Sequence, residues 1–361
     1  MTGKLNVVLA AGGTGGHIFP AESLAVELIK SGHKVTLITD KRYQKRAYTP
    51  EKMEIRTIQS ASTSGGFAAK INAIMAIAIG FAQARKHIKI LQADVVVGFG
   101  GYPSFPTMLA AVSLRKKTII HEQNALMGKV NRILAPFTKL IATSFTNTQG
   151  IRKSDLAKVV LTGNPVRPAI KAIKDFPYSG IDDDGHLHIL VVGGSQGTSF
   201  FSDVVPQAIM LLPENIRTKI RLDQQCRKED LAKVKGIYDK GGINAELAPF
   251  FEDVPARLAS SHIVIARAGA STLAELMVAG RPSILIPYMY AAEDHQMVNA
   301  LALEKFGGAI VFSQKILTPE MLNKSILRLA ENQDLLKKMA VNAFELGVPD
   351  AAERLAKLVV K

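Results

Sequence analysis

Apolar residues in the first half of the chain gather in short runs, each followed by glycine or polar residues. Runs of this kind are Leu5–Ala10, His33–Thr39, Asp94–Gly98 and Lys117–Ile120, and a helical pattern covers Pro20–Ser31. Short apolar runs bounded by turns indicate strands that are buried on both faces. Because these strands alternate with helices, the pattern predicts a parallel sheet with helices on both faces.

The second half of the chain begins in the same way as the first. His188–Val192 leads into a glycine turn, and it matches Val7–Ala11 at an offset of 181 residues. Two prolines within Gly163–Pro168 stiffen the connection between the halves. We therefore predict an α/β protein with two Rossmann-like, doubly wound domains, residues 1–163 and 164–349, rather than the alternative of one large sheet.

Composition limits the compartment in which the chain works. Of its 361 residues, 47% are apolar, enough for a core in each domain, and Cys226 is the single cysteine. One cysteine excludes an intramolecular disulfide and fits a reducing compartment. The sequence has neither a signal-peptide pattern after Met1 nor a run of about 18 apolar residues, so we expect a cytoplasmic protein without a transmembrane helix.

Charge is divided unevenly between the two halves. Met1–Gly163 carries 22 basic and 8 acidic residues, whereas Asn164–Lys361 carries 23 basic and 23 acidic residues. Such a field attracts a polyanion or an anionic membrane surface, and the alternative is a soluble protein that is simply basic. The chain has no Trp and few other aromatic residues, which argues against the stacking platforms of a nucleic-acid binder.

Three glycine-rich turns follow predicted strands, at Gly12–Gly16, Gly98–Gly101 and Gly193–Gly197. Such turns bring backbone N–H groups and helix N-termini close to an anion, so together they favour phosphate or sugar binding over tight turns without a ligand. Ile18 stands where a dinucleotide-binding fingerprint needs glycine. Asp40, at the end of the second strand, nevertheless keeps an NAD(P) enzyme as an alternative.

A strand at Ile263–Ala266 leads into small residues and then into a helix that carries Glu275. Small residues before a helix allow its N-terminal N–H groups to contact a diphosphate. We expect Glu275 in the first helical turn, where its carboxylate either interacts with the helix dipole or accepts hydrogen bonds from both hydroxyls of a ribose. The local pattern fits both interpretations equally well.

Acidic residues in the second half do not have the spacing of a metal site. Glu293–Gln296 includes His295, but no second histidine lies three or four positions away. Asp182–Asp184 precedes Gly185 and a strand, which indicates a solvated turn. We therefore expect neither a metal nor another cofactor.

Six motifs occur in an order that resembles one known family. They are GGTGGHIFPA from Gly12, GFGGYPSFP from Gly98, HEQNA from His121, GNPVR from Gly163, GGSQG from Gly193 and RAGASTLAE from Arg267. Together they are similar to the MurG family of bacterial UDP-N-acetylglucosamine transferases, which convert lipid I to lipid II in peptidoglycan synthesis. The resemblance implies a GT-B architecture, in which two domains face a central cleft and a last helix, here Asp350–Lys361, returns to the first domain.

The resemblance also assigns roles to individual residues. Those expected to face the reacting sugar and the acceptor are Thr14, Gly15, Gly16 and His17, with Gly101 and Tyr102 binding the acceptor. Those expected to bind UDP-N-acetylglucosamine are Asn124, Arg167 and Ser195 for sugar or phosphate, Arg267, Ala270, Ser271 and Thr272 for the nucleotide and diphosphate, Glu275 for the ribose, Gln296 for the sugar hydroxyls and Phe251 for uracil through its backbone. Because histidine titrates near neutral pH, His17 is the candidate general base, and the alternative is a helix-start residue that only bonds backbone.

Three positions depart from the family pattern. Ala268 stands where many members carry serine, and His295 occupies a position that is glutamine in some members. Asp223–Cys226 replaces a segment similar to His-Gln-Thr-Gly, so we assign no ligand contacts to it.

The resemblance implies an inverting, metal-independent transfer of N-acetylglucosamine from its UDP donor to the 4-hydroxyl of lipid I. It implies work at the cytoplasmic face of the bacterial inner membrane, with other cell-wall synthesis and division proteins as further candidate partners. A UDP-N-acetylglucosamine epimerase would share the fold and the donor but would need no membrane surface. A basic binding module without activity would explain the charge but not the HEQNA motif or Glu275.

An apolar segment in the first half of the chain predicts a surface that contacts the membrane. Phe67–Arg85 is apolar on nearly every side of a predicted helix, and it is too short and too interrupted to span a bilayer. The apolar members of this patch are Ile71, Ile74, Met75 and Ile79, and the basic members are Arg85, Lys86 and Lys89. We expect the patch to enter the cytoplasmic leaflet, and the alternative is a helix buried between two layers.

Overall fold

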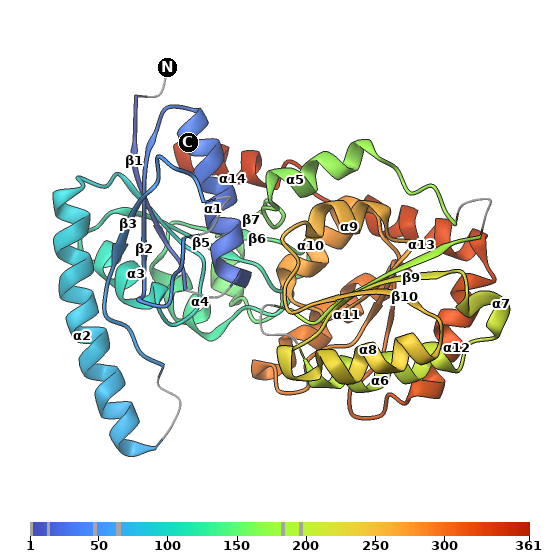
Figure 1. Ribbon diagram of the computed structural model, residues 1–361. Helices are drawn as coiled ribbons and strands as arrows, with labels where there is room; N and C mark the ends of the chain where they lie inside the picture. The colour runs from blue at the N-terminus through green and yellow to red at the C-terminus, as the bar shows by residue number, and fades with distance from the viewer. Residues whose placement is uncertain (1–2, 13–14, 46–48, 63–65, 182–184, 195–197) are drawn as a thin grey trace. The chain divides into compact units, whose positions relative to one another are not determined.

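The chain divides into two compact units (Figure 1). The computed structural model describes residues 3–12, 15–45, 49–62, 66–181, 185–194 and 198–361. The first unit consists of Met1–Arg167 together with Val348–Lys361, and the second of Pro168–Gly347. These boundaries lie within a few residues of Gly163 and Pro349, where the sequence pattern puts them.

In the described part of the first unit, seven parallel strands form one sheet. They are β1 (Asn6–Ala10), β2 (Lys34–Thr39), β3 (Glu54–Thr57), β4 (Val95–Gly98), β5 (Lys117–Glu122), β6 (Leu140–Thr143) and β7 (Val159–Leu161). Their order is β3-β2-β1-β4-β5-β6-β7, which makes β1 an interior strand. The four strands predicted for this half are confirmed as β1, β2, β4 and β5.

Helices cover both faces of this sheet. Those on one face are α1 (Gly15–Lys30) and α14 (Ala351–Val360), and those on the other are α2 (Phe67–Ile90), α3 (Ser104–Ser113) and α4 (Lys129–Leu134). The 3-10 helices of this unit are η1 (Ala135–Phe137) and η2 (Lys153–Lys158). Side chains of β1 point alternately to the two faces of the sheet. Val7 and Leu9 pack with α1 and α14, whereas Val8 packs with α2 and α3. The amphipathic helix expected at the end of the chain is confirmed as α14, which packs against α1.

Helix α1 starts earlier than the sequence pattern predicts. The pattern puts the start at Pro20, but the helix begins at Gly15 and contains Pro20. Proline has no N–H to donate to the carbonyl of Gly16, so the helix lacks one hydrogen bond near its start and still forms. The early start places His17 in the first helical turn, near the end of β1.

The described part of the second unit contains a sheet of six parallel strands. They are β8 (Leu187–Val192), β9 (Ile220–Gln225), β10 (Asn244–Ala248), β11 (Ile263–Ala266), β12 (Ser283–Leu285) and β13 (Ala309–Val311). Their order, β10-β9-β8-β11-β12-β13, repeats the order of the first six strands of the chain. β8 therefore takes the place of β1, as the 181-residue offset predicts, and the alternative of one large sheet is wrong.

The helices of the second unit also lie on both faces of its sheet. They are α5 (Pro168–Lys171), α6 (Ser199–Met210), α7 (Glu214–Arg217), α8 (Leu231–Lys240), α9 (Val254–Ser260), α10 (Ala270–Ala279), α11 (His295–Lys305), α12 (Pro319–Ala330) and α13 (Gln333–Glu345), with the 3-10 helices η3 (Ala172–Asp175), η4 (Lys228–Asp230) and η5 (Ala292–Asp294). α6 packs against α8 and α12 around Phe201 and Tyr238. α10 packs instead against α5, α11 and α13.

A buried arginine fixes the C-terminal end of α10. Arg281 is 2% exposed and donates hydrogen bonds to the carbonyl oxygens of Leu258, Ala259 and Ala279 at 2.9, 2.7 and 2.6 Å. Burial lowers the pKa of Arg281 to about 10, so the guanidinium stays charged at neutral pH. These bonds join the ends of α9 and α10, and they hold α10 rigidly with its N-terminus at the end of β11.

Candidate functional site

Three loops of the first unit meet at the carboxyl ends of neighbouring strands. The glycine turn after β1 leads into α1, the turn after β4 leads into α3, and the HEQNA segment ends β5. β1, β4 and β5 are adjacent in the sheet, so their loops share one edge. Ligands of open α/β sheets bind at this edge. We therefore call these loops the first-unit site.

Gly101, in the loop after β4, must be glycine because this loop passes close to His17. Gly101 has a φ of +73°, and a Cβ added there would lie 3.0 Å from Cδ2 and 3.1 Å from Nε2 of His17. Other residues would meet both backbone strain and a clash with the imidazole. Gly101, one of the two residues expected to bind the acceptor, thus lies beside the candidate base, His17.

His17 is half-buried, and Gln123 holds one of its nitrogens. Nδ1 of His17 lies 3.2 Å from Oε1 of Gln123, whose side chain is buried. The sequence reasoning gives Gln123 no role, although the residue lies within the HEQNA motif. Its place in the motif marks Gln123 as a candidate, but its contact with His17 joins positions 106 residues apart, so a local sequence pattern cannot predict that contact.

A buried carboxylate shapes the loop that carries Asn124. Glu122 Oε1 accepts from the backbone N–H and the Nδ2 amide of Asn124, at 3.0 and 3.1 Å. Its Oε2 accepts from the Gly128 N–H at 3.0 Å and from Asn131 Nδ2 at 2.8 Å. Because four N–H donors converge on one carboxylate, Asn124 is fixed at the edge of the site rather than left on a mobile loop.

Two further residues of the first unit lie near α1 and β2. The guanidinium carbon of Arg167 is 5.3 Å from the ring centre of Phe19 on α1. Arg42 lies 4.9 Å from the ring centre of Tyr102, and its Nη2 pairs with Asp40 Oδ2 at 2.7 Å. The carboxylate that an NAD(P) enzyme would use for a ribose is therefore paired with Arg42.

The structure describes some, but not all, of the other residues singled out in the sequence. Gly15 and Gly16 are the first residues of α1, and Gly16 is exposed. Thr14, Ser195 and the triplet Asp182–Asp184 lie outside the described residues.

In the second unit, a helix N-terminus follows β11. α10 begins at Ala270, directly after Gly269, which has an extended conformation with φ −66° and ψ 143°. Glycine has no side chain to cap the helix, and the N–H groups of the first turn, Ala270–Thr272, point along the helix axis toward a possible anion. The expected position of Glu275 is wrong. It lies in the second turn, because the small residues after Gly269 are already helical and form the first turn.

Arg267 lies beneath this helix end and is mostly buried. Its Nη1 donates to the carbonyl oxygens of Ile286 and Pro287 at 2.9 and 3.3 Å, and its Nη2 donates to Thr198 Oγ1 at 3.0 Å. The rings of Phe201 and Tyr288 lie 4.7 and 5.6 Å from the guanidinium carbon. Burial lowers the pKa of Arg267 to about 10, so it remains a cation at neutral pH. It ties the loops after β11 and β12 to the start of α6.

The first turn of α11 connects to the same loops. Gln296 Oε1 accepts from the Tyr288 N–H at 2.9 Å, and Asn299 Nδ2 donates to the Ala268 carbonyl oxygen at 3.2 Å. Gln296, Ser271 and Thr272 thus belong to segments that follow adjacent strands, β11 and β12. These segments, with Glu275, form the second-unit site.

Arg257 contacts both Phe251 and Asp223, which belongs to the segment that departs from the family pattern. Phe251 is buried, and the guanidinium carbon of Arg257 lies 4.1 Å from its ring centre. Arg257 also pairs with Asp223 Oδ1 at 2.7 Å. Asp223 therefore serves a charge network that supports the loop of Phe251.

Helix α2 exposes most of the predicted membrane patch. Ile74 is 63% exposed and Met75 is 53% exposed, and Ile71 and Ile79 are also exposed. From Lys70 to Ile90, its buried positions form a narrow stripe of small residues and one isoleucine, namely Ala73, Gly80, Ala84 and Ile88. Lys86 and Lys89 are exposed, whereas Arg85 donates from Nη1 to Ser113 Oγ at 2.6 Å. The alternative of a helix buried between two layers is therefore wrong. Among the described residues, none of the helices has the length and apolar character needed to cross a membrane.

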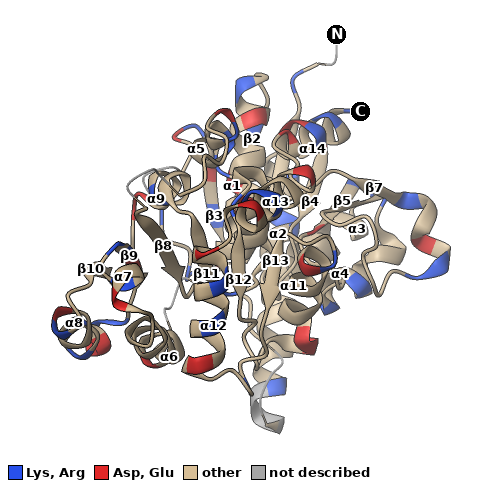
Figure 2. Cartoon of the chain, turned by 90° about the vertical axis from the view of Figure 1, so that its right-hand side faces the viewer, with Lys and Arg blue, Asp and Glu red and all other residues tan. Residues whose placement is uncertain are grey.

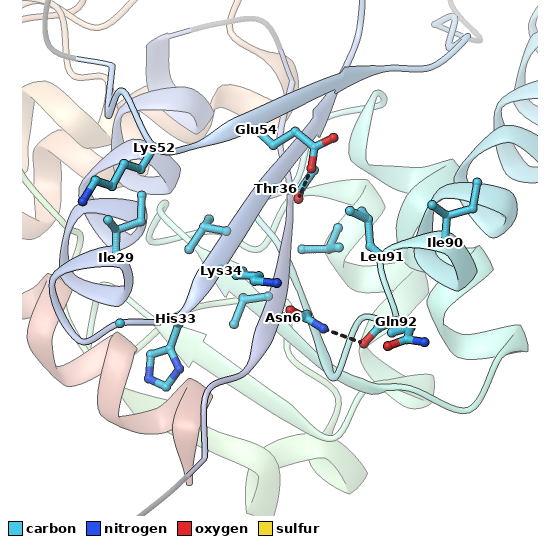
Figure 3. Close-up of a pocket in the computed structure, with 14 residues that line it drawn as sticks. Asn6, Ile29, His33, Lys34, Thr36, Lys52, Glu54, Ile90, Leu91 and Gln92 are labelled. Atoms are coloured by element: carbon cyan, nitrogen blue, oxygen red, sulfur yellow. Dashed lines mark hydrogen bonds between the residues drawn. The ribbon is translucent and has the colours of Figure 1, made fainter.

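A hollow of about 630 Å³ lies at the opposite edge of the first sheet (Figure 3). It is lined by the amino ends of β1, β2 and β3. Within this lining, Asn6 Nδ2 donates to the Gln92 carbonyl oxygen and Thr36 Oγ1 donates to Glu54 Oε2, both at 3.3 Å. The glycine turns and His17 lie at the carboxyl ends of the strands. The hollow is therefore separate from the first-unit site, and we assign it no ligand.

Comparison with known protein families identifies the class of protein to which this fold belongs. Residues 7–143 match the glycosyltransferase family 28 N-terminal domain, and residues 188–355 match the family 28 C-terminal domain. The chain belongs to glycosyltransferase family 28.

Its relatives carry a more particular name. A protein of Rhodospirillum centenum is 48% identical over 98% of this chain and 93% of its own length, and one of Paramagnetospirillum magneticum is 47% identical over 99% and 97%. Both are named UDP-N-acetylglucosamine–N-acetylmuramyl-(pentapeptide) pyrophosphoryl-undecaprenol N-acetylglucosamine transferase. The crystal structure of Acinetobacter baumannii MurG matches with a TM-score of 0.79 and 29% identity, over 98% of each chain.

Proposed function

We propose that this chain transfers N-acetylglucosamine from UDP-N-acetylglucosamine to the 4-hydroxyl of lipid I, which yields lipid II. The observation that carries the proposal is the N-terminus of α10, which presents backbone N–H groups at the carboxyl edge of a Rossmann-like sheet. Family membership over both units and the names of the relatives support the choice of substrates. In this proposal the second-unit site binds the donor and the first-unit site binds the acceptor.

The proposed reaction is one direct displacement. The acceptor oxygen forms a bond to the anomeric carbon on the face opposite UDP, and the bond between that carbon and the phosphate oxygen breaks, so the configuration inverts. His17 takes the proton of the attacking hydroxyl. The bonding electrons leave with UDP, whose diphosphate charge is stabilised by the first-turn N–H groups of α10. Glu275 accepts hydrogen bonds from the ribose hydroxyls, and Gln296 contacts the hydroxyls of the transferred sugar.

Arg267 has a supporting role in this proposal. It donates hydrogen bonds to Ile286, Pro287 and Thr198 of the protein itself, so it stabilises the leaving diphosphate as a nearby buried cation and by fixing the loops around α10. Arg167 lies in the first unit beside α1 and is the other proposed cation for the phosphates.

Transfer of labelled sugar to lipid I tests the proposal. We expect lipid II formation that persists in the presence of a metal chelator. In Glu275→Ala, we expect donor affinity to fall about 5- to 150-fold, because unpaired ribose hydroxyls cost roughly 1–3 kcal/mol. Glu331→Ala, which removes an exposed carboxylate at the end of α12, is the matched control. UDP release that needs no lipid acceptor would instead support an epimerase, and unchanged donor affinity in Glu275→Ala would refute its assignment.

We also propose that α2 holds the first unit at the cytoplasmic face of the membrane. Exposed isoleucines and Met75 give it an apolar surface, and α2 contains basic residues but no Asp or Glu. Each basic residue near an anionic surface contributes about 1 kcal/mol, screened by salt. On α8 of the second unit, by contrast with α2, basic and acidic residues are mixed: Lys235 pairs with Asp239, and blue and red lie together there in Figure 2.

Binding to vesicles with and without anionic lipid tests this contact. We expect salt-sensitive binding to anionic vesicles that is weakened by Ile79→Glu and by joint replacement of Lys86 and Lys89 with Gln. Ile316→Glu is the control, because Ile316 is an exposed isoleucine of the second unit. UDP-sugar binding should be unchanged in all three variants. Vesicle binding that survives the α2 changes would place the membrane contact elsewhere.

A further inference from the structure

Two histidines and a glutamine form a hydrogen-bonded chain in the first unit. Nε2 of Gln123 donates to the backbone oxygen of His121 at 3.0 Å and lies 3.0 Å from Nδ1 of the same residue. Oε1 of Gln123 lies 3.2 Å from Nδ1 of His17. At the far end, Nε2 of His121 lies 3.0 Å from the carbonyl oxygen of Gly163. His121 and Gln123 are at most 1% exposed, so bulk water does not compete for these bonds.

Two backbone carbonyls fix the direction of each bond in this chain. A carbonyl oxygen only accepts, so the amide nitrogen of Gln123 must face the His121 oxygen, and an N–H of His121 must face the Gly163 oxygen. His121 therefore carries its proton on Nε2, and its Nδ1 accepts from Gln123. Burial lowers the pKa of His121 to about 4, which agrees with a neutral imidazole at neutral pH.

The same reasoning determines where His17 carries its proton. Since Gln123 directs its nitrogen to His121, it presents its oxygen to His17, and that oxygen requires an N–H on His17 Nδ1. We infer that Gln123 is a positioning residue that holds neutral His17 in the tautomer protonated at Nδ1, so that the lone pair of Nε2 takes the acceptor proton. This inference rests on the proposed role of His17 in sugar transfer.

The surroundings of His17 agree with this assignment. Nε2 lies on the side of the ring that faces Gly101, in the loop expected to bind the acceptor. Gly12 and Gly101, which lie beside the ring, carry no charge, and His121 is coupled electrostatically to His17. The backbone at Gly163 thus sets the orientation of His17 through two buried side chains.

Nitrogen NMR of histidine-labelled protein reads the tautomer directly and needs no substrate. We expect the His17 signals, assigned with a His17→Gln variant, to show a protonated Nδ1 and an unprotonated Nε2 in the neutral form. In Gln123→Met, which has no acceptor oxygen, we expect the tautomer to shift toward protonation at Nε2. Gln224→Met is the matched control, because Gln224 is a buried glutamine of the second unit that bonds Phe201 and Tyr238. It should leave the His17 signals unchanged.

Kinetics provide the second measurement. We expect Gln123→Met to lower kcat about 10- to 100-fold with donor KM unchanged, because the base is misoriented but not removed, and complete loss of a general base costs about 10²–10⁴-fold. Gln123→Glu keeps an acceptor for Nδ1–H and adds a negative charge, which raises the pKa of His17. Since the base must be unprotonated, the acidic limb of its pH–rate profile should move to higher pH, while the Nδ1 tautomer is kept.

The two measurements separate failure of this inference from failure of the proposed function. A wild-type His17 protonated at Nε2, or a tautomer that does not change in Gln123→Met, would overturn the inference whatever the activity. If Gln123→Met does not fold, the wild-type spectrum and Gln123→Glu decide, and an unshifted acidic limb in Gln123→Glu counts against it. Absence of sugar transfer by a wild-type protein with the expected tautomer would refute the function instead.

Discussion

Acidification should destabilise the first unit through one buried histidine, His121. Burial lowers its pKa from 6.5 to about 4, against the opposing effect of the hydrogen bond to Gly163. A histidine with a lower pKa in the folded chain gains a proton on unfolding between these two values. Its contribution to stability is therefore complete above about pH 6.5 and is lost as the pH falls toward 4. The two pKa values correspond to about 3 kcal/mol in total.

The perturbation is His121→Gln, compared with the wild type at about pH 7.5 and about pH 5. The amide of glutamine can donate to the Gly163 carbonyl but does not titrate. We expect the stability advantage of the wild type over the variant to shrink by about 2 kcal/mol between these pH values, since carboxylates that titrate in both proteins cancel. Native-state hydrogen exchange of peptides from β1 and β5 reports the first unit specifically. A stability difference that stays constant with pH would refute the reasoning.

Three further substitutions test other parts of the framework. Glu122→Gln replaces one acceptor oxygen with a donor, so at least one of the N–H groups of Asn124, Gly128 and Asn131 loses its partner; we expect a loss of roughly 2–4 kcal/mol in urea unfolding. Arg281→Lys cannot reach the same carbonyls, and we expect about 3 kcal/mol of destabilisation in the second unit, measured by hydrogen exchange of α10. Gly101→Ala adds a Cβ 3.0 Å from the imidazole of His17 at a φ of +73°, and we expect kcat to fall at least about 10-fold with little change in donor affinity.

The arrangement of strands follows from local patterns in the sequence. The buried runs of β1 and β8 are continuous in apolar residues, so their positions and their repetition after 181 residues can be predicted directly from the sequence. Helix boundaries are harder to predict. α1 begins at Gly15, inside a glycine-rich turn, and α10 begins at Ala270, directly after Gly269, and such sequence resembles a loop until the fold shows that it is helical. The misplaced turn of Glu275 has this origin.

Exposure of α2 depends on tertiary packing rather than on local pattern. The helix is apolar on nearly all sides, so periodicity alone does not select a buried face. Gly80 resolves the choice, because a Cβ there would overlap the carbonyl oxygen of Gln59, which shows that this side is pressed against the chain before α2. The contact of Gln123 with His17 is similarly hidden, since His17 lies in the first turn of α1, 106 residues away in the sequence.

In the proposed function, the two units use one topology for different chemical tasks. Loops after β1, β4 and β5 bring together an imidazole and a chain of neutral hydrogen-bonding groups, which suits the acceptance of a proton. Loops after β11 and β12 bring together a helix N-terminus and the buried cation Arg267, which suits the stabilisation of a departing diphosphate. A base beside a cationic cluster would have a lowered pKa and a weaker pull on the acceptor proton. In the proposed reaction, His17 and Arg267 belong to different sheets, so the base does not share its immediate surroundings with this buried cation.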